Sequence, residues 1–130
     1  MTPKQLKEAQ AITDIVCIQN FYNVAHRNDD GFIDDLARQD IAYVHFFPLG
    51  GFNPLQSASL DAVAALLRAT PMQVALAWLL HRSRNILLIA GTSSVEHLRE
   101  NLAAAELTLP AETLDRLDGL AAESQENQKA

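Results

Sequence analysis

The sequence contains one cysteine, no cluster of basic residues and no long apolar run. Because Cys17 is the only cysteine, a disulfide framework within the chain and a metal site built on paired cysteines are excluded. Ten Lys and Arg stand against sixteen Asp and Glu, a net charge of −6, which argues against a nucleic-acid or anionic-membrane partner. No apolar stretch approaches the roughly 18 residues that span a bilayer, and residues 1–5 do not resemble a signal sequence. We therefore expect a cytoplasmic chain without a targeting segment.

The composition is that of a globular protein. Of the 130 residues, 48% are hydrophobic and 20% are charged, with five Gly and five Pro, so neither disorder nor a fibrous repeat is indicated. The length suits one ordinary domain or part of a larger one. A packed core is expected.

Three short apolar runs, at residues 15–18, 41–47 and 86–89, predict strands. The first run does not alternate between apolar and polar residues, which is typical of a parallel strand buried on both faces. Pro48 and Gly50 end the second run, because proline cannot donate to a strand ladder and glycine loosens the backbone.

One helix-capping pattern occurs twice. Thr-Pro-Lys-Gln at residues 2–5 and Thr-Pro-Met-Gln at residues 70–73 each place a hydroxyl before a helix, a proline at its first position and a glutamine that reaches back. The first helix is expected to run to about residue 11. The second is strongly apolar over residues 74–79, so we expect it to be largely buried.

Further helices are expected where a cap precedes spaced apolar residues. Asn-Asp-Asp at residues 28–30 precedes one of about ten residues, Ser59 caps another, and Ser93 with Glu96 forms a capping box for a third. The helix after Ser59 carries Val63, Leu66 and Leu67 on one side, and the helix after Ser93 is expected to face inward with Val95, Leu98 and Leu102. A last helix near Pro110 shows Leu114, Leu117 and Leu120 at threefold spacing. Residues 52–58 are expected to form a loop and residues 123–130 a disordered tail.

Strands that alternate with helices indicate right-handed β-α units and a parallel sheet, so we predict an α/β fold. A closed (β/α)8 TIM barrel needs eight strands and about 250 residues, whereas this pattern holds about three parallel strands with flanking helices. A three-stranded sheet leaves two edges with unpaired backbone groups. Residues 1–122 therefore look like about half of a larger fold, short of a closed barrel.

Four separated motifs lie at residues 18–23 (Ile-Gln-Asn-Phe-Tyr-Asn), 46–50 (Phe-Phe-Pro-Leu-Gly), 74–80 (Val-Ala-Leu-Ala-Trp-Leu-Leu) and 89–94 (Ile-Ala-Gly-Thr-Ser-Ser), the last continuing to Glu100-Asn101. In this order and spacing they resemble the C-terminal half of the aldo-keto reductase family. The resemblance implies a β/α barrel of NADPH-dependent carbonyl reductases. It covers nearly the whole chain, from the fifth barrel helix to the helix after the eighth strand.

The resemblance implies ten cofactor-binding positions. Gln19 matches the glutamine that holds the nicotinamide amide, Phe46 matches an aromatic residue, usually tyrosine, that stacks on the nicotinamide ring, and Leu49 matches a residue along the pyrophosphate path. Seven residues match the 2′-phosphate and adenosine end: Gly91, Thr92, Ser93, Ser94, His97, Glu100 and Asn101. Many relatives have arginine at the position of His97, so NADP(H) is the expected cofactor and NAD(H) is not excluded.

The same residues also admit plainer interpretations. Gly91 and the hydroxyls before a helix N-terminus suit a phosphate, yet Ser93 can serve as a helix cap alone. Phe46 can be a buried strand aromatic, because the pattern does not decide whether Phe46 or Phe47 faces a pocket. Gln19, at the expected carboxyl end of its strand, can instead bond to loop backbone groups. The four histidines lack metal-ligand spacing, so no metal site is predicted.

No catalytic residue is predicted in this chain. Carbonyl reduction by hydride transfer needs a proton donor whose pKa is lowered by a nearby cation. In the family that the chain resembles, an Asp, a Tyr, a Lys and a His do this from strands that precede the part matched here. Tyr22 matches a tyrosine that is structural in the family.

The sequence thus predicts the cofactor-binding C-terminal portion of an NADP(H)-dependent oxidoreductase that interconverts carbonyls and alcohols, without the catalytic tetrad. In one hypothesis the chain needs an N-terminal half-barrel for activity. In a second it is a non-catalytic dinucleotide-binding or interaction module, and in a third an inactive truncated fragment. Its open sheet edges also give it a reason to pair with a second copy of itself.

Overall fold

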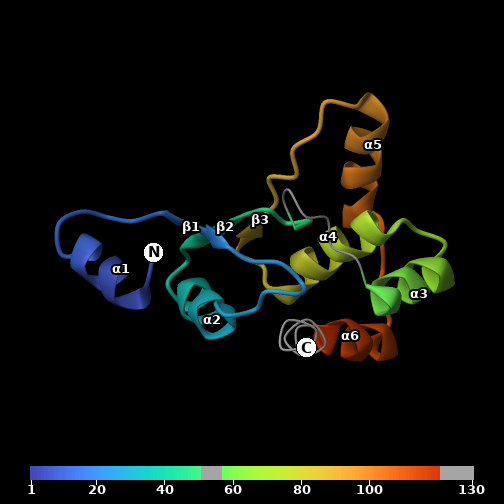
Figure 1. Cartoon of the computed structure of the whole chain (residues 1–130). Helices are drawn as coiled ribbons and strands as arrows, with labels where there is room; N and C mark the ends of the chain where they lie inside the picture. The colour runs from blue at the N-terminus through green and yellow to red at the C-terminus, as the bar shows by residue number, and fades with distance from the viewer. Residues whose placement is uncertain (51–56, 121–130) are drawn as a thin grey trace, which may run out of the picture.

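A parallel sheet of three strands, with β2 at its centre, organises the chain (Figure 1). The computed structural model describes residues 1–50 and 57–120. Strand β1 (Cys17–Phe21) pairs with β2 (Ala42–Phe46), and β2 pairs with the short β3 (Ile86–Leu87). The parallel pairing confirms the predicted α/β class.

Six α-helices and one 3₁₀ turn complete the described residues: α1 (Pro3–Gln10), α2 (Asp30–Arg38), α3 (Ala58–Leu67), α4 (Pro71–Arg82), α5 (Val95–Ala103), η1 (Ala104–Glu106) and α6 (Ala111–Asp118). Helix α2 connects β1 to β2, and α3 with α4 connects β2 to β3, as parallel strands require. The predicted loop at residues 52–58 lies largely outside the described residues, and the predicted tail at residues 123–130 lies wholly outside them.

Both Thr-Pro-x-Gln patterns begin helices as predicted. At α1, Thr2 Oγ1 accepts a hydrogen bond from the Gln5 N–H at 3.2 Å, and Gln5 Oε1 accepts from the Thr2 N–H at 2.8 Å. Thr70 and Gln73 make the same reciprocal pair at α4, at 3.1 and 3.0 Å. Each box satisfies two N–H groups that lack partners within the helix.

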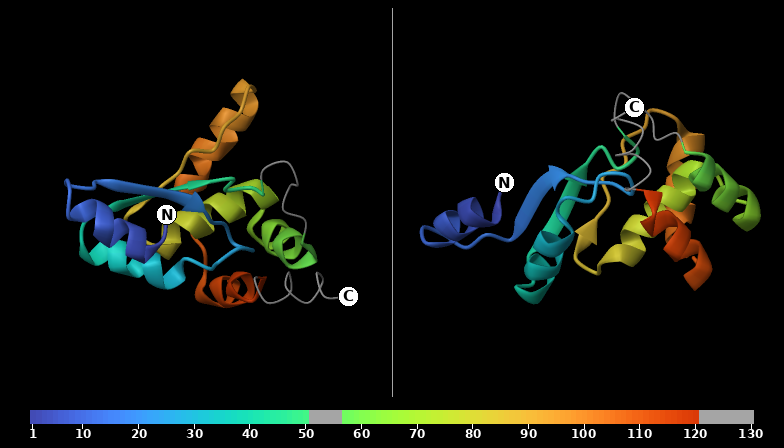
Figure 2. Two further views of the ribbon diagram at one scale, coloured as in Figure 1. Left: turned by 60° about the vertical axis from the view of Figure 1, so that its left-hand side comes forward. Right: turned by 60° about the horizontal axis from the view of Figure 1, so that its bottom comes forward.

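The core lies between one face of the sheet and helices α2 and α4, which Figure 2 (left) shows on the same side of the strands. Ile18 of β1, Tyr43 of β2 and Ile86 of β3 are neighbours in register and are all buried. The helices contribute Phe32, Ile33 and Leu36 from α2 and residues 74–79 from α4. Helix α4 is therefore the largely buried helix that the sequence predicts. Leu117 and Leu120, at the threefold spacing noted in the sequence, are also buried in the core.

No single helix within residues 1–50 and 57–120 is long and apolar enough to cross a membrane. Helices α3 and α4 reach that length and composition only as a pair, across a bend of 91°. Because α4 is mostly buried, its apolar character is explained by the core.

The opposite face of the sheet is open, so the prediction of a strand buried on both faces is wrong. Cys17, Gln19 and Phe21 of β1 and Leu87 of β3 are exposed on it. Burial on both faces needs a second layer, and no helix of the described residues packs on this side. In a closed barrel this face would be the interior. The strand bounds also differ from the predicted ones. Strand β1 covers residues 17–21 instead of 15–18, and β3 covers residues 86–87 instead of 86–89.

Helix α5 projects away from the rest of the molecule (Figures 1 and 2). Val95, Leu98 and Leu102 are 66%, 48% and 66% exposed, so the prediction that they face inward is wrong. Their spacing forms an apolar stripe, but no element of the described residues packs on it. The helix is tied to α4 by a hydrogen bond of 3.2 Å from Gln73 Nε2 to the Glu100 carbonyl.

Helix α3 begins earlier than its predicted cap implies. Ser57, not Ser59, is the cap residue, and its Oγ accepts a hydrogen bond from the Leu60 N–H at 3.3 Å. Val63 is buried as expected, whereas Leu66 is exposed. Leu60 and Val63 lie three residues apart on the buried stripe, and Leu66 lies at the edge of that stripe.

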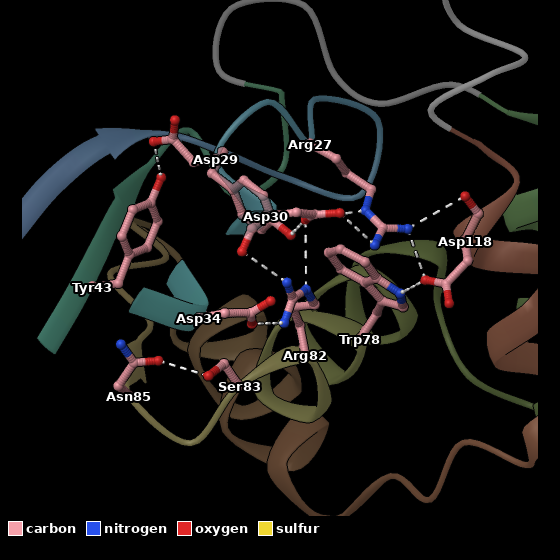
Figure 3. Close-up of polar contacts among 11 residues, drawn as sticks. Arg27, Asp29, Asp30, Asp34, Tyr43, Trp78, Arg82, Ser83, Asn85 and Asp118 are labelled. Atoms are coloured by element: carbon pink, nitrogen blue, oxygen red, sulfur yellow. Dashed lines mark hydrogen bonds and ion pairs between the residues drawn. The ribbon is translucent and has the colours of Figure 1, made fainter. Parts of the chain in front are cut away.

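Asp29 occupies the cap position of α2, but its side chain does not cap the helix as predicted. Its Oδ2 instead accepts a hydrogen bond of 2.8 Å from the Tyr43 hydroxyl (Figure 3). The same oxygen accepts a second bond, of 2.6 Å, from Asn20 Nδ2. A buried hydroxyl is costly without a partner, so Asp29 satisfies the core strand rather than the helix N–H groups. Burial and the bond to Asp29 raise the pKa of Tyr43.

Two arginines hold the helix layer together through carboxylates (Figure 3). Arg27 lies 2.7 Å from Asp30, and Arg82 lies 2.8 Å from Asp34 and 3.5 Å from Asp30. Asp30 also accepts a hydrogen bond of 2.5 Å from the hydroxyl of the fully buried Tyr22. Burial and this bond raise the pKa of Tyr22. Burial acts to raise the pKa of Asp30 as well, but the hydrogen bonds from Tyr22 and Arg27 outweigh it, so the pKa of Asp30 is lowered. Tyr22 therefore serves the core and not the open face.

Candidate functional site

A cavity of about 560 Å³ opens at the carboxyl ends of β2 and β3, beside α5. Its lining comes from four places: residues 46–49 after β2, Met72 at the start of α4, residues 89–92 after β3, and His97 and Asn101 on α5. The carboxyl ends of parallel strands are where α/β folds bind their ligands. We take this cavity as the candidate site.

Six of the ten predicted cofactor-binding residues line the cavity: Phe46, Leu49, Gly91, Thr92, His97 and Asn101. Ser93 and Ser94 belong to the same loop as Thr92 but are not among the lining residues, and neither are Glu100 and Gln19. The fold thus gathers residues from two strand ends and one helix that are far apart in the sequence.

Phenylalanine rings form one wall of the cavity. Phe46 and Phe47 both line it, with ring centroids 5.5 Å apart and planes at 84°. Phe21, at the end of β1, stacks on Phe46 at 5.8 Å and meets the edge of Phe47 at 6.2 Å. The sequence pattern left open which of the two consecutive rings faces a pocket, and in the structure both do.

The loop after β3 leaves its backbone open to close approach. A Cβ added at Gly91 would meet no heavy atom within 4 Å, so a ligand has access to the backbone there. Thr92 Oγ1 accepts a hydrogen bond from the Ser94 N–H at 3.1 Å, which orders the loop.

Ser94, and not Ser93, caps α5, so the predicted capping box of Ser93 with Glu96 is wrong. Ser94 Oγ accepts a hydrogen bond from the His97 N–H at 3.3 Å. Within the described residues the N–H groups of Val95 and Glu96 have no partner, because the cap satisfies one of the three free donors of the first turn. Two helix N–H groups remain available to an anion.

Gln19 lies in the middle of β1 and not at its carboxyl end, where the sequence predicts it. Pairing with β2 continues beyond Gln19, which is opposite Val44, to Phe21, which is opposite Phe46. The side chain is exposed on the open face of the sheet, the face that also carries Phe21. Gln19 therefore faces the same side as the phenylalanine wall without lining the cavity.

Five lining residues were not predicted: Phe47, Pro48, Met72, Ile89 and Ala90. Phe47, Pro48, Ile89 and Ala90 adjoin predicted positions, so a wider interpretation of the two strand ends would have found them. Met72 gives a weaker signal, an exposed apolar residue in the first turn of a helix that is otherwise buried.

The lining carries no acid and base pair. Among the lining residues that belong to the described ranges, His97 is the one ionisable side chain, and it is exposed. In the part of the chain that the structure describes, no three His, Cys, Asp or Glu side chains gather as a metal site would require. The arrangement suits binding and orientation of a ligand more than proton transfer.

Residues 1–122 match the Aldo/keto reductase family. This chain belongs to that family. The match takes in β1, β2 and β3 and all four segments that line the cavity.

Two curated relatives cover most of this aldo/keto reductase chain. It is 66% identical over 123 residues to pyridoxine 4-dehydrogenase of Escherichia coli (strain K12). The aligned region covers 95% of this chain and 43% of that protein. It is 35% identical over 119 residues to an uncharacterised oxidoreductase of Schizosaccharomyces pombe, covering 91% of this chain and 39% of that protein. The chain therefore spans less than half the length of these relatives.

Solved aldo-keto reductase structures confirm the predicted fold. A thermostable aldo-keto reductase in complex with the inhibitor epalrestat superposes with a TM-score of 0.83 at 34% identity, over 92% of this chain and 46% of the other. An aldo/keto reductase from Klebsiella pneumoniae in complex with NADP and acetate gives 0.82 at 22% identity, over 93% and 46%. The sheet and helices of this chain thus correspond to part of an aldo-keto reductase barrel.

Proposed function

We propose that this chain is the dinucleotide-binding portion of an aldo-keto reductase that interconverts a carbonyl and an alcohol with NADP(H). The observation that carries the proposal is the cavity at the carboxyl ends of β2 and β3, lined by six residues that the family resemblance assigns to the cofactor. Bound NADP(H) would supply or accept the hydride. The chain's own residues would bind and orient it.

The residues of the cavity fit the two ends of a dinucleotide. The rings of Phe46 and Phe47 offer an apolar aromatic wall against which a planar nicotinamide ring can stack. The open backbone at Gly91 and the free N–H groups of Val95 and Glu96 offer donors to phosphate oxygens. We assign Leu49 to the path between these ends and Asn101 to the adenosine end.

Four further residues remain part of this proposal although they do not line the cavity. Gln19 would reach the nicotinamide amide from the open face of the sheet, and Ser93, Ser94 and Glu100 would complete the adenosine and phosphate end. The exposure of Gln19 on the side of the phenylalanine wall favours its role.

The preference for NADP(H) over NAD(H) depends on His97. A guanidinium can bind a phosphate through two parallel hydrogen bonds, whereas the two nitrogens of an imidazole cannot donate to one phosphate in this paired arrangement. We therefore propose NADP(H) as cofactor with a modest preference, and NAD(H) as the alternative.

Catalysis would require a second polypeptide segment. The cavity has no proton donor paired with a cation, and the open sheet face and the stripe of Val95, Leu98 and Leu102 on α5 have no cover in the described residues. We propose an N-terminal half-barrel of the same family as that cover, because it would bring both the missing strands and the catalytic residues. A second copy of this chain is the alternative, since it would cover apolar surface but supply no catalytic residues.

The substrate proposal rests on the relative that is 66% identical, a pyridoxine 4-dehydrogenase. We propose an aromatic primary alcohol of that kind and its aldehyde as the substrate pair. The hydride would pass between the cofactor and the aldehyde carbon, and a proton would pass to or from the oxygen. The phenylalanine wall is consistent with a planar substrate. A cytoplasmic location also remains part of the proposal.

Reconstitution tests the proposal. The purified chain would be mixed with the part of the E. coli relative that it does not match, and oxidation of NADPH by the 4-aldehyde of pyridoxine would be followed. Turnover in the mixture, with neither part active alone, supports the proposal. A stable complex that neither binds NADPH nor reduces the aldehyde contradicts it. NADPH binding by the chain without any turnover in the mixture would favour the second candidate, a non-catalytic dinucleotide-binding module.

A further inference from the structure

Asn23 is a fully buried polar residue directly after β1 and Tyr22. Its backbone forms an isolated antiparallel bridge with His26, with N–H to carbonyl distances of 3.2 and 3.0 Å. Its Oδ1 accepts hydrogen bonds from the N–H groups of Ala25 at 3.0 Å and His26 at 3.1 Å. The oxygen of the side chain is therefore committed to a tight turn at the end of β1.

The nitrogen of the same side chain reaches a different strand. Asn23 Nδ2 donates a hydrogen bond of 3.3 Å to the carbonyl of Phe47, directly after β2. Phe47 has a φ of 56°, a left-handed conformation that a bulky residue rarely adopts. Its carbonyl also accepts from the Gly50 N–H at 3.1 Å, so two donors hold the backbone in this unfavourable conformation.

Ring contacts also connect the turn at Asn23 to Phe47. The imidazole of His26, in the turn that Asn23 Oδ1 organises, packs on Phe21 at 4.7 Å. Phe21 in turn contacts Phe46 at 5.8 Å and Phe47 at 6.2 Å. Asn23, His26 and the three phenylalanines thus form a closed circuit of contacts. Cutting the circuit at Asn23 would remove one of the hydrogen bonds that hold the backbone of Phe47, beside the rings of the wall.

We propose that Asn23 is a positioning residue for the cofactor, which acts through its carboxamide nitrogen by fixing Phe47 and the phenylalanine wall of the cavity. This inference rests on the proposed function, because the wall matters only if the cavity binds a planar ring. Asn23 itself is not among the residues that line the cavity. Its effect is therefore indirect, on ring orientation.

The substitution Asn23→Asp separates the two roles of the side chain. An aspartate keeps an oxygen for the turn N–H groups of Ala25 and His26, but it loses the donor to the Phe47 carbonyl and places a second oxygen against it. Should Asn23→Asp fail to fold, Asn23→Ser provides a neutral variant. A serine hydroxyl can accept from the turn but is too short to reach Phe47.

Asn85→Asp is the matched control. Asn85 Nδ2 also donates to a backbone carbonyl, that of Ile41 at 2.9 Å, and its Oδ1 also accepts locally, from Ser83 Oγ at 2.7 Å. It lies just before β3, at the amino end of the sheet, and is not among the residues that line the cavity; Figure 3 shows its bond to Ser83. Its substitution removes the bond to Ile41 and a second, longer one of 3.4 Å to the carbonyl of Ile33, without touching the phenylalanine wall.

Two readouts on the full chain test the inference. In ¹³C-phenylalanine spectra without cofactor, Asn23→Asp should shift the resonances of Phe21, Phe46 and Phe47 and spare Phe32, whereas Asn85→Asp should spare the first three. In fluorescence titrations with NADPH, Asn23→Asp should weaken binding about tenfold and Asn85→Asp by less than about twofold. The melting temperatures of the two variants should fall by similar amounts.

The two readouts separate the failure of this inference from the failure of the proposed function. Unchanged Phe21, Phe46 and Phe47 resonances in Asn23→Asp would overturn the inference, as would equal losses of NADPH affinity in the Asn23 and Asn85 variants. Absence of NADPH binding by the unsubstituted chain would count against the proposed function. In that case the spectra alone decide whether Asn23 positions the wall.

Discussion

The indole N–H of Trp78 donates a hydrogen bond of 3.0 Å to Asp118, which joins α4 to the last residue of α6 (Figure 3). The same carboxylate oxygen lies 2.9 Å from Arg27, whose guanidinium stands 5.0 Å above the indole ring. Trp78 is almost fully buried, and Asp118 is the hydrogen-bond partner of its N–H. One surface carboxylate thus satisfies a core donor and an arginine together.

Replacement of Asp118 should destabilise the chain. Asp118→Ala leaves a buried N–H unsatisfied and should cost about 1–2 kcal/mol in the free energy of unfolding. Asp118→Asn keeps an oxygen for the indole and should cost less than half as much. Urea denaturation followed by the fluorescence of the single tryptophan measures both. Asp115→Ala on the same helix is the control, expected within about 0.5 kcal/mol of the parent. Equal losses at both aspartates would refute the assignment.

His45 should make the chain sensitive to acid. It is fully buried on β2, neither ring nitrogen has a hydrogen-bond partner among residues 1–50 and 57–120, and burial lowers its pKa to about 4 from 6.5. As the pH falls below about 6.5, His45 therefore binds a proton in the unfolded chain but stays neutral in the folded chain until the pH nears 4. Stability should be full above about pH 6.5 and fall as the pH drops towards 4, with a total loss of about 3 kcal/mol.

His45→Leu should remove that acid slope and raise stability at neutral pH, because an apolar side chain does not leave buried nitrogens unsatisfied. Urea denaturation at several pH values between 4 and 8 gives the comparison, where the pH range is set by the lowered pKa of His45. His81→Gln, at an exposed histidine of α4, is the control and should keep the slope. An unchanged slope in His45→Leu would show that other groups govern the acid response.

Arg68 ends α3 in a left-handed conformation, with a φ of 53°. Glycine adopts this conformation without the steric cost of a Cβ, so Arg68→Gly should stabilise the chain by about 0.5–1 kcal/mol. Arg68→Ala removes the same side chain but keeps the Cβ, and it should have no stabilising effect. Thermal melting of the two variants side by side makes the comparison. If Arg68→Ala were stabilised as much as Arg68→Gly, the gain in stability would come from loss of the arginine side chain and not from relief of the left-handed backbone.

His97→Arg should increase the preference for NADPH over NADH. His97 lines the cavity near the free N–H groups of the first turn of α5, where the 2′-phosphate is proposed to lie. A guanidinium there adds a permanent charge and a second donor, so the ratio of the two dissociation constants should change by about tenfold. Arg99→His, on the same helix but not on the cavity lining, is the control. An equal gain for NADH and NADPH would place the phosphate elsewhere.

Features encoded by neighbouring residues could be predicted from the sequence. The capping boxes at Thr2 and Thr70 need only residues three apart, and the apolar run of α4 needs only its own composition. Both were predicted correctly. Asp29 was misassigned because its partner is Tyr43, on another strand, and this tertiary hydrogen bond outcompetes the local cap.

The error at α5 has a different physical origin. Its apolar stripe was correctly recognised, but the direction that the stripe faces depends on what packs against it, and the described residues provide no such layer. The same holds for the open face of β1, which the apolar run at residues 15–18 placed in a double-sided core. An apolar stripe or run indicates which residues are suited to burial, but it does not show whether another element is present to bury them.

The candidate site was predictable only in part. Phe46, Gly91 and His97 were identified through a family resemblance, since two strand ends and a helix meet there only in three dimensions. Met72 was missed because an exposed methionine in a helical first turn has many ordinary explanations. Asn23 was noted only as the last residue of the motif at residues 18–23, because its hydrogen bond to Phe47 is a tertiary contact that no local pattern reveals.

The central claim is that this chain binds a nicotinamide dinucleotide in the cavity beside α5. Titration of the purified full chain with NADPH, following cofactor fluorescence and thermal melting together, tests it most directly. We predict saturable binding with a raised melting temperature, as a ligand that binds only the folded state must produce. No saturation up to about 1 mM NADPH, with an unchanged melting temperature, would contradict the claim.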